Sequence, residues 1–475
     1  MKLSSITNIP TRTGFRYVVD KTIYGYSKAC NIKLSSGKFV CPAVEAKLSD
    51  IIIGSTNYDY KASIHTNVKK YLGWFRRYYD NRNYNANTDL VGDMTAAPRV
   101  RYISAGSLEI VSADVDLDGV VEIPTMFVID SNVAFALMDA ETGNIKKYAL
   151  NPGFSYYTHV QFFDINNDGY LEIIVIPADV SGLFVFDHNL NKIFEKSAES
   201  DKVACQDIDG DGEVEILVMS KSGITCFRSD GTEKWSNPNI ITPGTIDYVD
   251  VVVHDVDKDG KHEIFCGYSN VSENLYHVLS IDPVDGSKIN EVTFDGGAGP
   301  VSLMMSIYEG ASPILSVLLP HGSKKVAYLD TGDLSEAWSV DLSIYAPYDD
   351  AKLLHGGSLI SLSYGISKLT MIANNGDKLW EKSSVGRHSA SGVVCDVDGD
   401  DELEFVTLLY PSKICAFDVY SGSEIWSIQL PQDADTILQA IADDIDYDGY
   451  LEIIMSVVNT AKTPPDQYTL IIDGE

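Results

Sequence analysis

Six short acidic segments hold the residues of this chain that are best suited to chemistry. Each places a carboxylate or an amide at positions 1, 3, 5 and 9, and five of the six have glycine at position 6. In the exception, Asp401 takes the place of the glycine. A cation of the size of Ca²⁺ takes about six to eight oxygen ligands from a flexible loop, and glycine allows the sharp bend that such a loop needs. The pattern therefore predicts calcium loops.

The expected side-chain ligands are the residues at positions 1, 3, 5 and 9. They are Asp114, Asp116, Asp118 and Glu122; Asp164, Asn166, Asp168 and Glu172; Asp207, Asp209, Asp211 and Glu215; Asp255, Asp257, Asp259 and Glu263; Asp396, Asp398, Asp400 and Glu404; Asp444, Asp446, Asp448 and Glu452. We expect about six structural Ca²⁺ ions, because each loop supplies its own ligands and leaves no obvious position for a substrate. Solvated Asp-Gly turns without an ion are the alternative, but six segments in one register favour metal binding.

The position of the glutamate separates these segments from EF-hands. An EF-hand loop has its last ligand at position 12 and lies between two helices. Here the glutamate stands at position 9, and an apolar run such as 173–176 or 216–219 follows at once. Because a similar run precedes each segment, for example 251–253, the sequence predicts a β-hairpin around each loop.

The loops recur at a spacing that predicts a repeated unit. The first aspartates up to Asp255 are 50, 43 and 48 residues apart, and the gap of 141 residues to Asp396 has room for two units without the acidic loop. Hairpin remnants at 306–317 and 353–362 mark those two units. A second hairpin follows each loop and often ends in tryptophan. Units of about 40–50 residues with four strands indicate β-propeller blades.

We therefore expect an all-β fold, an eight-bladed β-propeller with four-stranded blades over residues 96–475; seven or nine blades are the alternatives. The last unit ends at 468–475 after its third strand, which would leave an unpaired edge. The strand 99–105, just before the first unit, is the expected fourth strand that closes the propeller.

The acidic hairpins resemble the FG-GAP repeats of integrin α-subunit propellers and of many bacterial surface proteins. The resemblance covers about residues 99–475, with Glu in place of the more common Asp at position 9. It implies Ca²⁺ as the cofactor, bound by the side chains named above and by the backbone carbonyl of position 7. The position-7 residues are Val120, Tyr170, Glu213, Lys261, Glu402 and Tyr450. The outer hairpins resemble those of quinoprotein-like propellers, and the blade plan is similar to that of rhamnogalacturonan lyases.

Charge divides the chain into two parts. The formal net charge is −32, but residues 1–95 carry +7, which leaves −39 for the remainder. An acidic surface argues against a nucleic-acid partner, since phosphate binding needs Lys and Arg. Residues 1–95 lack the repeat pattern and contain a basic aromatic run at 68–79. We expect this region to be an attachment or capping module that docks the chain into a larger assembly.

Apolar content and the first residues bear on the location of the protein. No run reaches the length of about 18 apolar residues that a transmembrane helix needs, so membrane insertion is not expected. The first ten residues lack the apolar core of a signal peptide. Calcium loops nevertheless suit millimolar calcium, and we therefore expect an extracellular protein or one on a virion surface. Seven cysteines without a CxxC pair are expected to be mostly free and buried.

The face made by the connections between strands 2 and 3, and between blades, is the expected ligand surface. Tyrosines in 154–159, 242–248 and 268–276 suit a glycan, although packing between blades explains them as well. His159, His321, His355, Arg387 and His388 are the candidates for acid–base chemistry, and Lys324 and Lys325 could be recruited.

No spacing singles out a catalytic set among these residues, so no catalytic residue is assigned. The leading hypothesis is a calcium-stabilised recognition or adhesion protein whose propeller face binds a glycan or a protein. Whether the chain is an enzyme is open. The alternative is a polysaccharide lyase that acts on an acidic glycan.

Overall fold

The structure is a computed structural model that contains only strands as regular elements in the part of the chain it describes. Up to residue 91 it describes the strands β1 to β10 alone. Beyond that it describes residues 92–94, 98–105, 110–197, 199–296, 304–308, 313–319, 325–341, 350–353, 359–363, 368–373, 375, 377–383, 392–400, 402–409, 412–430, 434, 436–459 and 466–474. These residues include no helix that could span a membrane. The expected all-β fold is confirmed.

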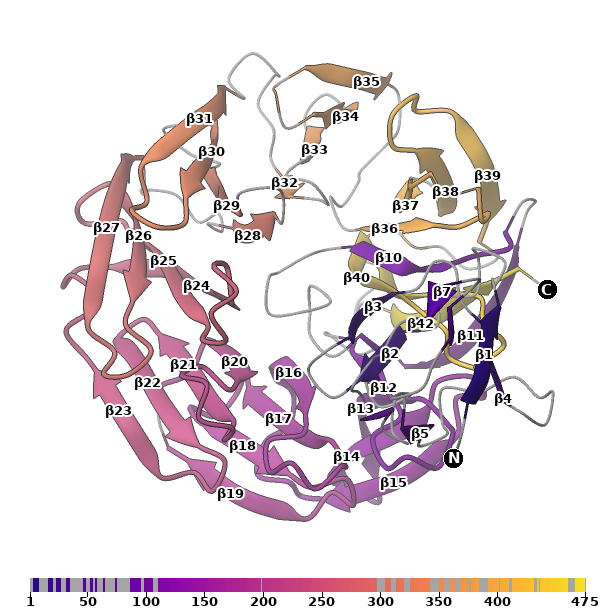
Figure 1. The fold of residues 1–475 in the computed structure, drawn as a ribbon, viewed down its shortest axis with the longest axis horizontal. Coiled ribbons are helices and arrows are strands. Elements are labelled where there is room, and N and C mark those ends of the chain that lie inside the picture. The colour runs from indigo at the N-terminus through magenta and orange to yellow at the C-terminus, as the bar shows by residue number, and fades with distance from the viewer. Residues whose placement is uncertain are drawn as a thin grey trace.

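A four-stranded antiparallel sheet recurs from residue 112 onward. The sheets are β12 (Ser112–Ala113), β13 (Glu122–Ile129), β14 (Asn132–Asp139) and β15 (Ile145–Leu150); β16 (Tyr157–Phe163), β17 (Glu172–Pro177), β18 (Leu183–Phe186) and β19 (Lys192–Lys196); β20 (Lys202–Gln206), β21 (Glu215–Ser220), β22 (Gly223–Arg228) and β23 (Glu233–Asn237); β24 (Ile246–His254), β25 (Glu263–Asn270), β26 (Leu275–Ile281) and β27 (Lys288–Asp295); β28 (Met304–Tyr308), β29 (Ile314–Leu319), β30 (Lys325–Asp330) and β31 (Glu336–Asp341); β32 (Asp350–Leu353), β33 (Leu359–Ser363), β34 (Lys368–Ile372) and β35 (Lys378–Ser383); β36 (Gly392–Asp396), β37 (Glu404–Leu409), β38 (Lys413–Asp418) and β39 (Glu424–Gln429). Figure 1 shows them around a circle, with the first strand of each sheet innermost and the fourth outermost.

The last sheet takes its outer strand from the other end of the sequence. It consists of β40 (Thr436–Asp443), β41 (Glu452–Asn459), β42 (Asp466–Asp473) and β11 (Arg99–Ala105). β11 pairs antiparallel with β42, in a register that places Arg99 opposite Asp473 and Ala105 opposite Tyr468. The strand expected from the sequence to supply the missing edge therefore occupies that edge.

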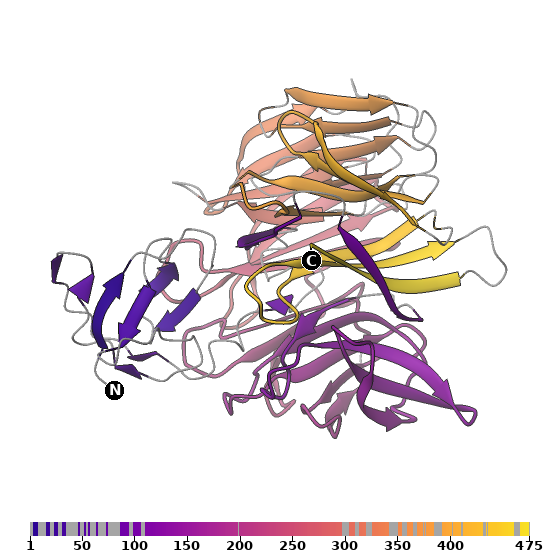
Figure 2. The same ribbon diagram turned by 90° about the vertical axis from the view of Figure 1, so that its right-hand side faces the viewer.

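Strands of the first 91 residues lie apart from the repeated sheets or add to their inner edges. Two small sheets order as β4 (Asn31–Leu34), β1 (Leu3–Thr7), β6 (Ile52–Ile53), β7 (Thr56–Asn57) and as β3 (Ile23–Tyr26), β2 (Arg16–Val19), β8 (Ser63–Ile64), β5 (Ala46–Lys47). Figure 2 shows these strands, in dark blue and violet, to one side of the ring. β9 (Gly73–Trp74) pairs with β12, and β10 (Ala86–Val91) runs parallel to β36. Two strands from the predicted attachment region thus join propeller sheets.

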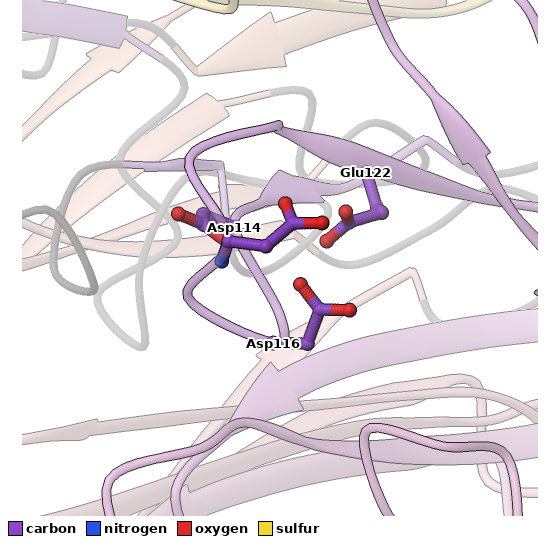
Figure 3. A group of neighbouring side chains, drawn as sticks. Asp114, Asp116 and Glu122 are labelled. Atoms are coloured by element: carbon purple, nitrogen blue, oxygen red, sulfur yellow. The ribbon is translucent and has the colours of Figure 1, made fainter. Parts of the chain in front are cut away.

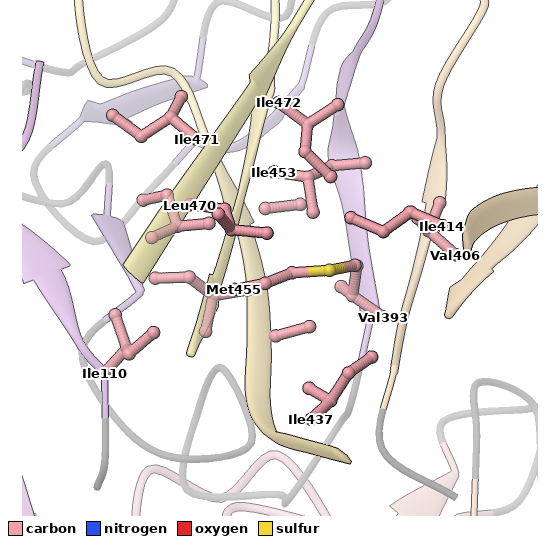
Figure 4. Packing of buried hydrophobic residues seen from close by; sticks show 14 of the residues in the cluster. Ile110, Val393, Val406, Ile414, Ile437, Ile453, Met455, Leu470, Ile471 and Ile472 are labelled. Atoms are coloured by element: carbon pink, nitrogen blue, oxygen red, sulfur yellow. The ribbon is translucent and has the colours of Figure 1, made fainter. Parts of the chain in front are cut away.

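The hydrophobic core forms because the inner strands have apolar side chains on both faces. Every residue of β17 and of β41 is buried, whereas the outer strand β15 contains only exposed and half-buried residues. The largest cluster joins the last sheet to its neighbours through residues such as Ile110, Val393 and Met455 (Figure 4). Tight packing of this kind holds each sheet at a fixed angle to the next and so positions the turns between strands.

Aromatic side chains on the outer strands connect successive sheets. The Trp235 indole donates a hydrogen bond to the carbonyl of Pro283 at 2.9 Å, and Trp380 donates to the carbonyl of Val419 at 2.8 Å. Both rings lie against a glycine of the following sheet. A Cβ on Gly422, whose φ is +68°, would lie 2.6 Å from Trp380 Cγ. Glycine is required there both for its backbone conformation and for the space it leaves.

Candidate calcium centres

The acidic segments form the connections between the first and second strands of their sheets, as the sequence predicts. Position 4 is left-handed in all six loops, and position 6 is left-handed in the five loops where it is glycine. In the first loop these are Leu117 (φ 61°) and Gly119 (φ 93°), and in the last they are Tyr447 (φ 62°) and Gly449 (φ 98°). Glycine at position 6 therefore meets a conformational need, while position 4 tolerates other residues at some cost.

A repeated network of hydrogen bonds fixes the position-1 and position-9 side chains. In the first loop the N–H groups of Asp118 and Gly119 donate to Asp114 Oδ1 and Oδ2 at 3.0 and 2.9 Å. The N–H of Val115 donates to Glu122 Oε2 at 2.8 Å. The bond from position 2 to the position-9 glutamate recurs at Glu172, Glu215, Glu263, Glu404 and Glu452. Backbone donors thus preorganise the ligand carboxylates.

The expected ligands gather into compact groups in five of the loops. Ligand atoms within 4.8 Å of one another come from Asp114, Asp116, Asp118 and Glu122; Asp207, Asp209 and Glu215; Asp255, Asp257 and Asp259; Asp396, Asp398 and Glu404; Asp444, Asp446 and Glu452. Figure 3 shows Asp114, Asp116 and Glu122 converging on one point. Asp211, Glu263, Asp400 and Asp448 lie outside these groups. Oxygens bound to one calcium ion at about 2.4 Å lie no more than about 4.8 Å from one another, so these groups are compact enough to share an ion.

The remaining expected ligands have defined partners as well. In the second loop, Asn166 donates its amide to Glu172 Oε1 at 3.0 Å, which brings positions 3 and 9 together. The position-7 residues donate their N–H groups to the position-5 aspartate, for example Val120 to Asp118 at 3.0 Å and Tyr450 to Asp448 at 2.8 Å. This bond folds the last part of each loop back over the acidic group.

Burial makes these carboxylates costly to ionise without a cation. Glu122, Glu404 and Glu452 are almost fully buried. Burial is the largest cause that raises the pKa of Glu122 to about 7, of Glu404 to about 8 and of Glu452 to about 10, and neighbouring aspartates raise all three further. A divalent cation would favour the ionised forms, because an opposite charge nearby stabilises them.

The donor set fits calcium. It consists of carboxylate and carbonyl oxygens, which are the ligands that this hard cation prefers. Within the described residues, Asp444 Oδ1 and Asp209 Oδ1 are buried and have no hydrogen-bond partner. Buried oxygens of this kind are rare in folded proteins unless a cation or water satisfies them. When bound, calcium would be held by the side chains of positions 1, 3, 5 and 9 and would neutralise them.

Two lysines that the sequence does not mark as site residues point into the loops. Lys146 of β15 contacts the first acidic group and Lys234 of β23 contacts the third. Both follow their loop by about one hairpin, so their positions depend on strand register and not on a local motif. A lysine in the outer strand is no distinguishing signal, because β19, β27 and β35 contain lysines as well.

Most of the described candidates for the ligand face are packing residues. Tyr157, Tyr268 and Tyr276 are buried, which contradicts the glycan-contact interpretation and confirms packing between blades for these three. His159 is 2% exposed in β16. Lys325 pairs with Glu336 at 2.6 Å. The other candidates, His321, Lys324, His355, Arg387 and His388, lie outside the described residues.

The cysteines that the structure describes agree with the sequence expectation. Cys205, Cys226, Cys266, Cys395 and Cys415 are buried thiols that form no disulfide. Burial raises the pKa of Cys226 to about 12, so this thiol stays protonated and unreactive at neutral pH.

Comparison with solved structures supports a propeller. A europium-containing methanol dehydrogenase superposes with a TM-score of 0.57 at 9% identity, covering 82% of this chain and 90% of that one. The quinohemoprotein alcohol dehydrogenase ADHIIG from Pseudomonas putida HK5 gives 0.55 at 9% identity, covering 86% and 81%. The quinohemoprotein alcohol dehydrogenase from Comamonas testosteroni gives 0.55 at 10% identity, covering 85% and 81%. At such identities the likeness concerns the fold alone.

Sequence comparison adds a family match within the third and fourth units. The model of the FG-GAP-like repeat matches residues 207–266, which contain two of the acidic loops. A search of curated protein sequences finds no match. Together with the repeated four-stranded sheets, these findings identify the chain as a β-propeller repeat protein that contains FG-GAP-like repeat sequence.

Proposed function

We propose that this chain is a calcium-stabilised, eight-bladed β-propeller that acts as a non-enzymatic binding protein. Eight blades are supported by the sheets that begin with β12, β16, β20, β24, β28, β32, β36 and β40, and the pairing of β11 with β42 supports closure at the last blade. Calcium is proposed for the acidic loops because buried carboxylates converge there without another function.

Exposed apolar side chains are the observation that supports a binding function. Val128, Ile129, Leu150, Tyr156 and Val180, here called the apolar rim, are all at least about one third exposed, and Val128 reaches 70%. They lie at the connection between the second and third strands of the first two blades, or at the connection between these blades. Neighbouring strands run antiparallel, so these connections are on the face opposite the acidic loops.

Backbone contacts hold parts of the apolar rim together. The N–H of Ala178 donates to the carbonyl of Tyr156 at 3.0 Å, and the N–H of Asn151 donates to the carbonyl of Val133 at 2.8 Å. The rim is therefore presented by fixed turns. Exposed apolar side chains that share one face of a protein are candidates for an interaction site.

The composition of the rim favours a protein over a glycan as partner. Four of its five members are aliphatic, whereas glycans are best held by flat aromatic rings with polar groups beside them. We further propose that residues 1–95 attach the propeller to a larger assembly, such as a virion or a cell-surface complex. Calcium loops support an extracellular setting for that assembly.

The test begins with cross-linking of the calcium-loaded full chain in its source material and mass spectrometry of the products. A partner should cross-link beside the rim. With that partner purified, the double variant Val128→Ser, Val180→Ser should bind at least about tenfold more weakly, since each buried aliphatic side chain contributes about 1.5 kcal/mol or more. Val284→Ser, an exposed valine in a turn on the face of the acidic loops, serves as the control and should bind normally.

Two outcomes would redirect the proposal. Binding to a glycan array that the double variant abolishes would make the ligand a glycan. Release of unsaturated products from an acidic polysaccharide would make the chain a lyase and would overturn the non-enzymatic assignment.

A further inference from the structure

The ammonium group of Lys146 lies inside the first acidic group. Its Nζ is 2.8 Å from Asp118 Oδ1 and 3.7 Å from Asp116 Oδ1, and it also contacts Glu122. The side chain is mostly buried, at 18% exposure. The adjacent Lys147 adds a second cation, 2.7 Å from Asp116 Oδ2. The ammonium of Lys146 therefore contacts carboxylates from three ligand positions, as a bound cation would.

Lys234 repeats this arrangement in the third loop. Its Nζ is 2.6 Å from Asp209 Oδ2, 2.8 Å from Glu215 Oε1 and 3.8 Å from Asp211 Oδ2. The side chain is 12% exposed. Positions 3, 5 and 9 of both loops thus share the same kind of partner, from the same strand of their respective sheets.

Both lysines occupy a β-bulge in the outer strand. In the first sheet Leu137 pairs with Lys147 and Met138 with Ile145, so Lys146 is the unpaired residue. In the third sheet Cys226 pairs with Trp235 and Phe227 with Glu233, which leaves Lys234 unpaired. A bulge re-aims the side chain of its extra residue, and here it directs the lysine at the loop of its own blade.

Three other sheets combine an acidic loop with a hairpin of their third and fourth strands. In these sheets the bulge residue of the fourth strand is aliphatic. The register shifts place Ile193, Ile289 and Ile425 at the equivalent position. Ile289 is 57% exposed and offers no charge to the fourth loop. A cavity of about 480 Å³ borders that loop at Asp257 and Glu263. The bulge residue therefore divides the loops into two kinds.

We propose that Lys146 and Lys234 are internal competitors of calcium, so that the loops 114–122 and 207–215 bind the ion more weakly than the fully acidic loops without a bulge lysine. This inference rests on the proposed calcium binding and adds a rank order to it. A lysine has a compact charge on a flexible stem and can leave the acidic group when calcium enters. At low calcium the ammonium neutralises part of its loop, and at high calcium the ion replaces it.

The consequence is that the loops of this protein bind calcium in two ranges of calcium concentration. The loops at 255–263, 396–404 and 444–452 have a carboxylate at each of the four expected ligand positions and no bulge lysine among the described contacts, so they fill first. The two lysine-containing loops fill at higher calcium. Blades with a bulge lysine keep their fold when calcium is scarce, since the ammonium supplies a counter-ion.

Equilibrium dialysis with radioactive calcium, which counts ions bound at each free concentration, tests the rank order in the full chain. Lys146→Met and Lys234→Met should each move one ion from the weak to the tight class, with an affinity gain of about tenfold or more, because one charge-assisted hydrogen bond changes binding by at least about that factor. Lys288→Met is the matched control. Lys288 stands next to the bulge residue of the fourth sheet but pairs with Glu291, so its replacement should change no binding class.

A reciprocal variant keeps the test decisive if a lysine replacement prevents folding. Ile289→Lys places an ammonium at the equivalent bulge over the loop 255–263 and should move one tight ion to the weak class. Unchanged isotherms for all three bulge variants, with calcium still bound, would overturn the competition and leave the proposed calcium binding intact. Absence of bound calcium in the wild-type protein would instead overturn the proposed binding itself.

Discussion

Replacing Glu404 by glutamine should change the stability of the protein in opposite directions with and without calcium. Glu404 is 1% exposed, and its Oε2 accepts a hydrogen bond from the N–H of Val397 at 2.9 Å. Glutamine keeps an oxygen for that bond and has nearly the same shape. The substitution therefore removes the charge and little else.

The magnitude follows from the pKa of this carboxyl. Burial, with the nearby Asp398 and Asp396, raises it from 4.5 to about 8 in the calcium-free fold. At pH 7 the folded protein must hold a proton that the unfolded chain releases, at a cost of about 1.4 kcal/mol for each pH unit above 4.5, or about 3 kcal/mol in all. Glu404→Gln removes this cost and should stabilise the calcium-free protein by up to that amount.

With calcium bound, the wild-type protein should be more stable than the Glu404→Gln variant. Binding stabilises the wild-type fold by about 2.7 kcal/mol at a calcium concentration 100 times the dissociation constant, and more above it. The variant lacks one anionic ligand and should gain much less. Urea unfolding followed by tryptophan fluorescence, once in EDTA and once in millimolar calcium, gives both midpoints.

The control for this prediction is Glu402→Gln in the same loop. Glu402 is exposed and contributes only its backbone to the turn, through an N–H bond to Asp400 at 2.9 Å. Its replacement should leave both midpoints nearly unchanged. If Glu404→Gln lowered stability equally in EDTA and in calcium, position 9 would be a structural hydrogen-bond acceptor and the reasoning on buried charge would be wrong.

Three further outcomes are expected. Because burial raises the pKa of Glu452 from 4.5 to about 10, the calcium-free melting temperature should fall as pH rises from 5 to 8, and calcium should flatten or invert this slope in differential scanning calorimetry. Gly422→Ala should lower the urea midpoint more than Gly212→Ala does, since both have positive φ but only the first Cβ would meet a tryptophan; equal losses would argue against the Trp380 contact. Ile471→Ala in β42 should cost about 2–5 kcal/mol by the same assay, because its side chain is fully buried in the largest cluster; a loss under about 1 kcal/mol would contradict that packing.

Features encoded within a few residues could be predicted from the sequence. The acidic loops and their hairpins were predictable because the ligand spacing and the turn glycine act locally. The hairpins without acidic residues, now β28 with β29 and β32 with β33, were predictable from the repeat length. The strand β11 could be placed because an unfinished last unit requires a partner at its open edge.

Features that depend on register or on distant contacts could not be predicted. The parallel pairing of β10 with β36 joins residues about 300 positions apart, and no local pattern specifies it. The bulge that directs Lys146 into its loop appears only when two strands are aligned residue by residue. Burial of Tyr268 likewise depends on the neighbouring sheet, since tyrosine suits both a core and a surface.

The pairing of β11 with β42 sets an order for biosynthesis. The first of these strands leaves the ribosome more than 350 residues before the second, as the partners Arg99 and Asp473 show. During that interval β11 cannot pair with β42, and its unpaired edge is available to other chains. Contacts between such distant segments also slow folding. Loss of β42 should therefore harm yield and solubility more than its short length suggests, because the nascent chain could not complete that sheet.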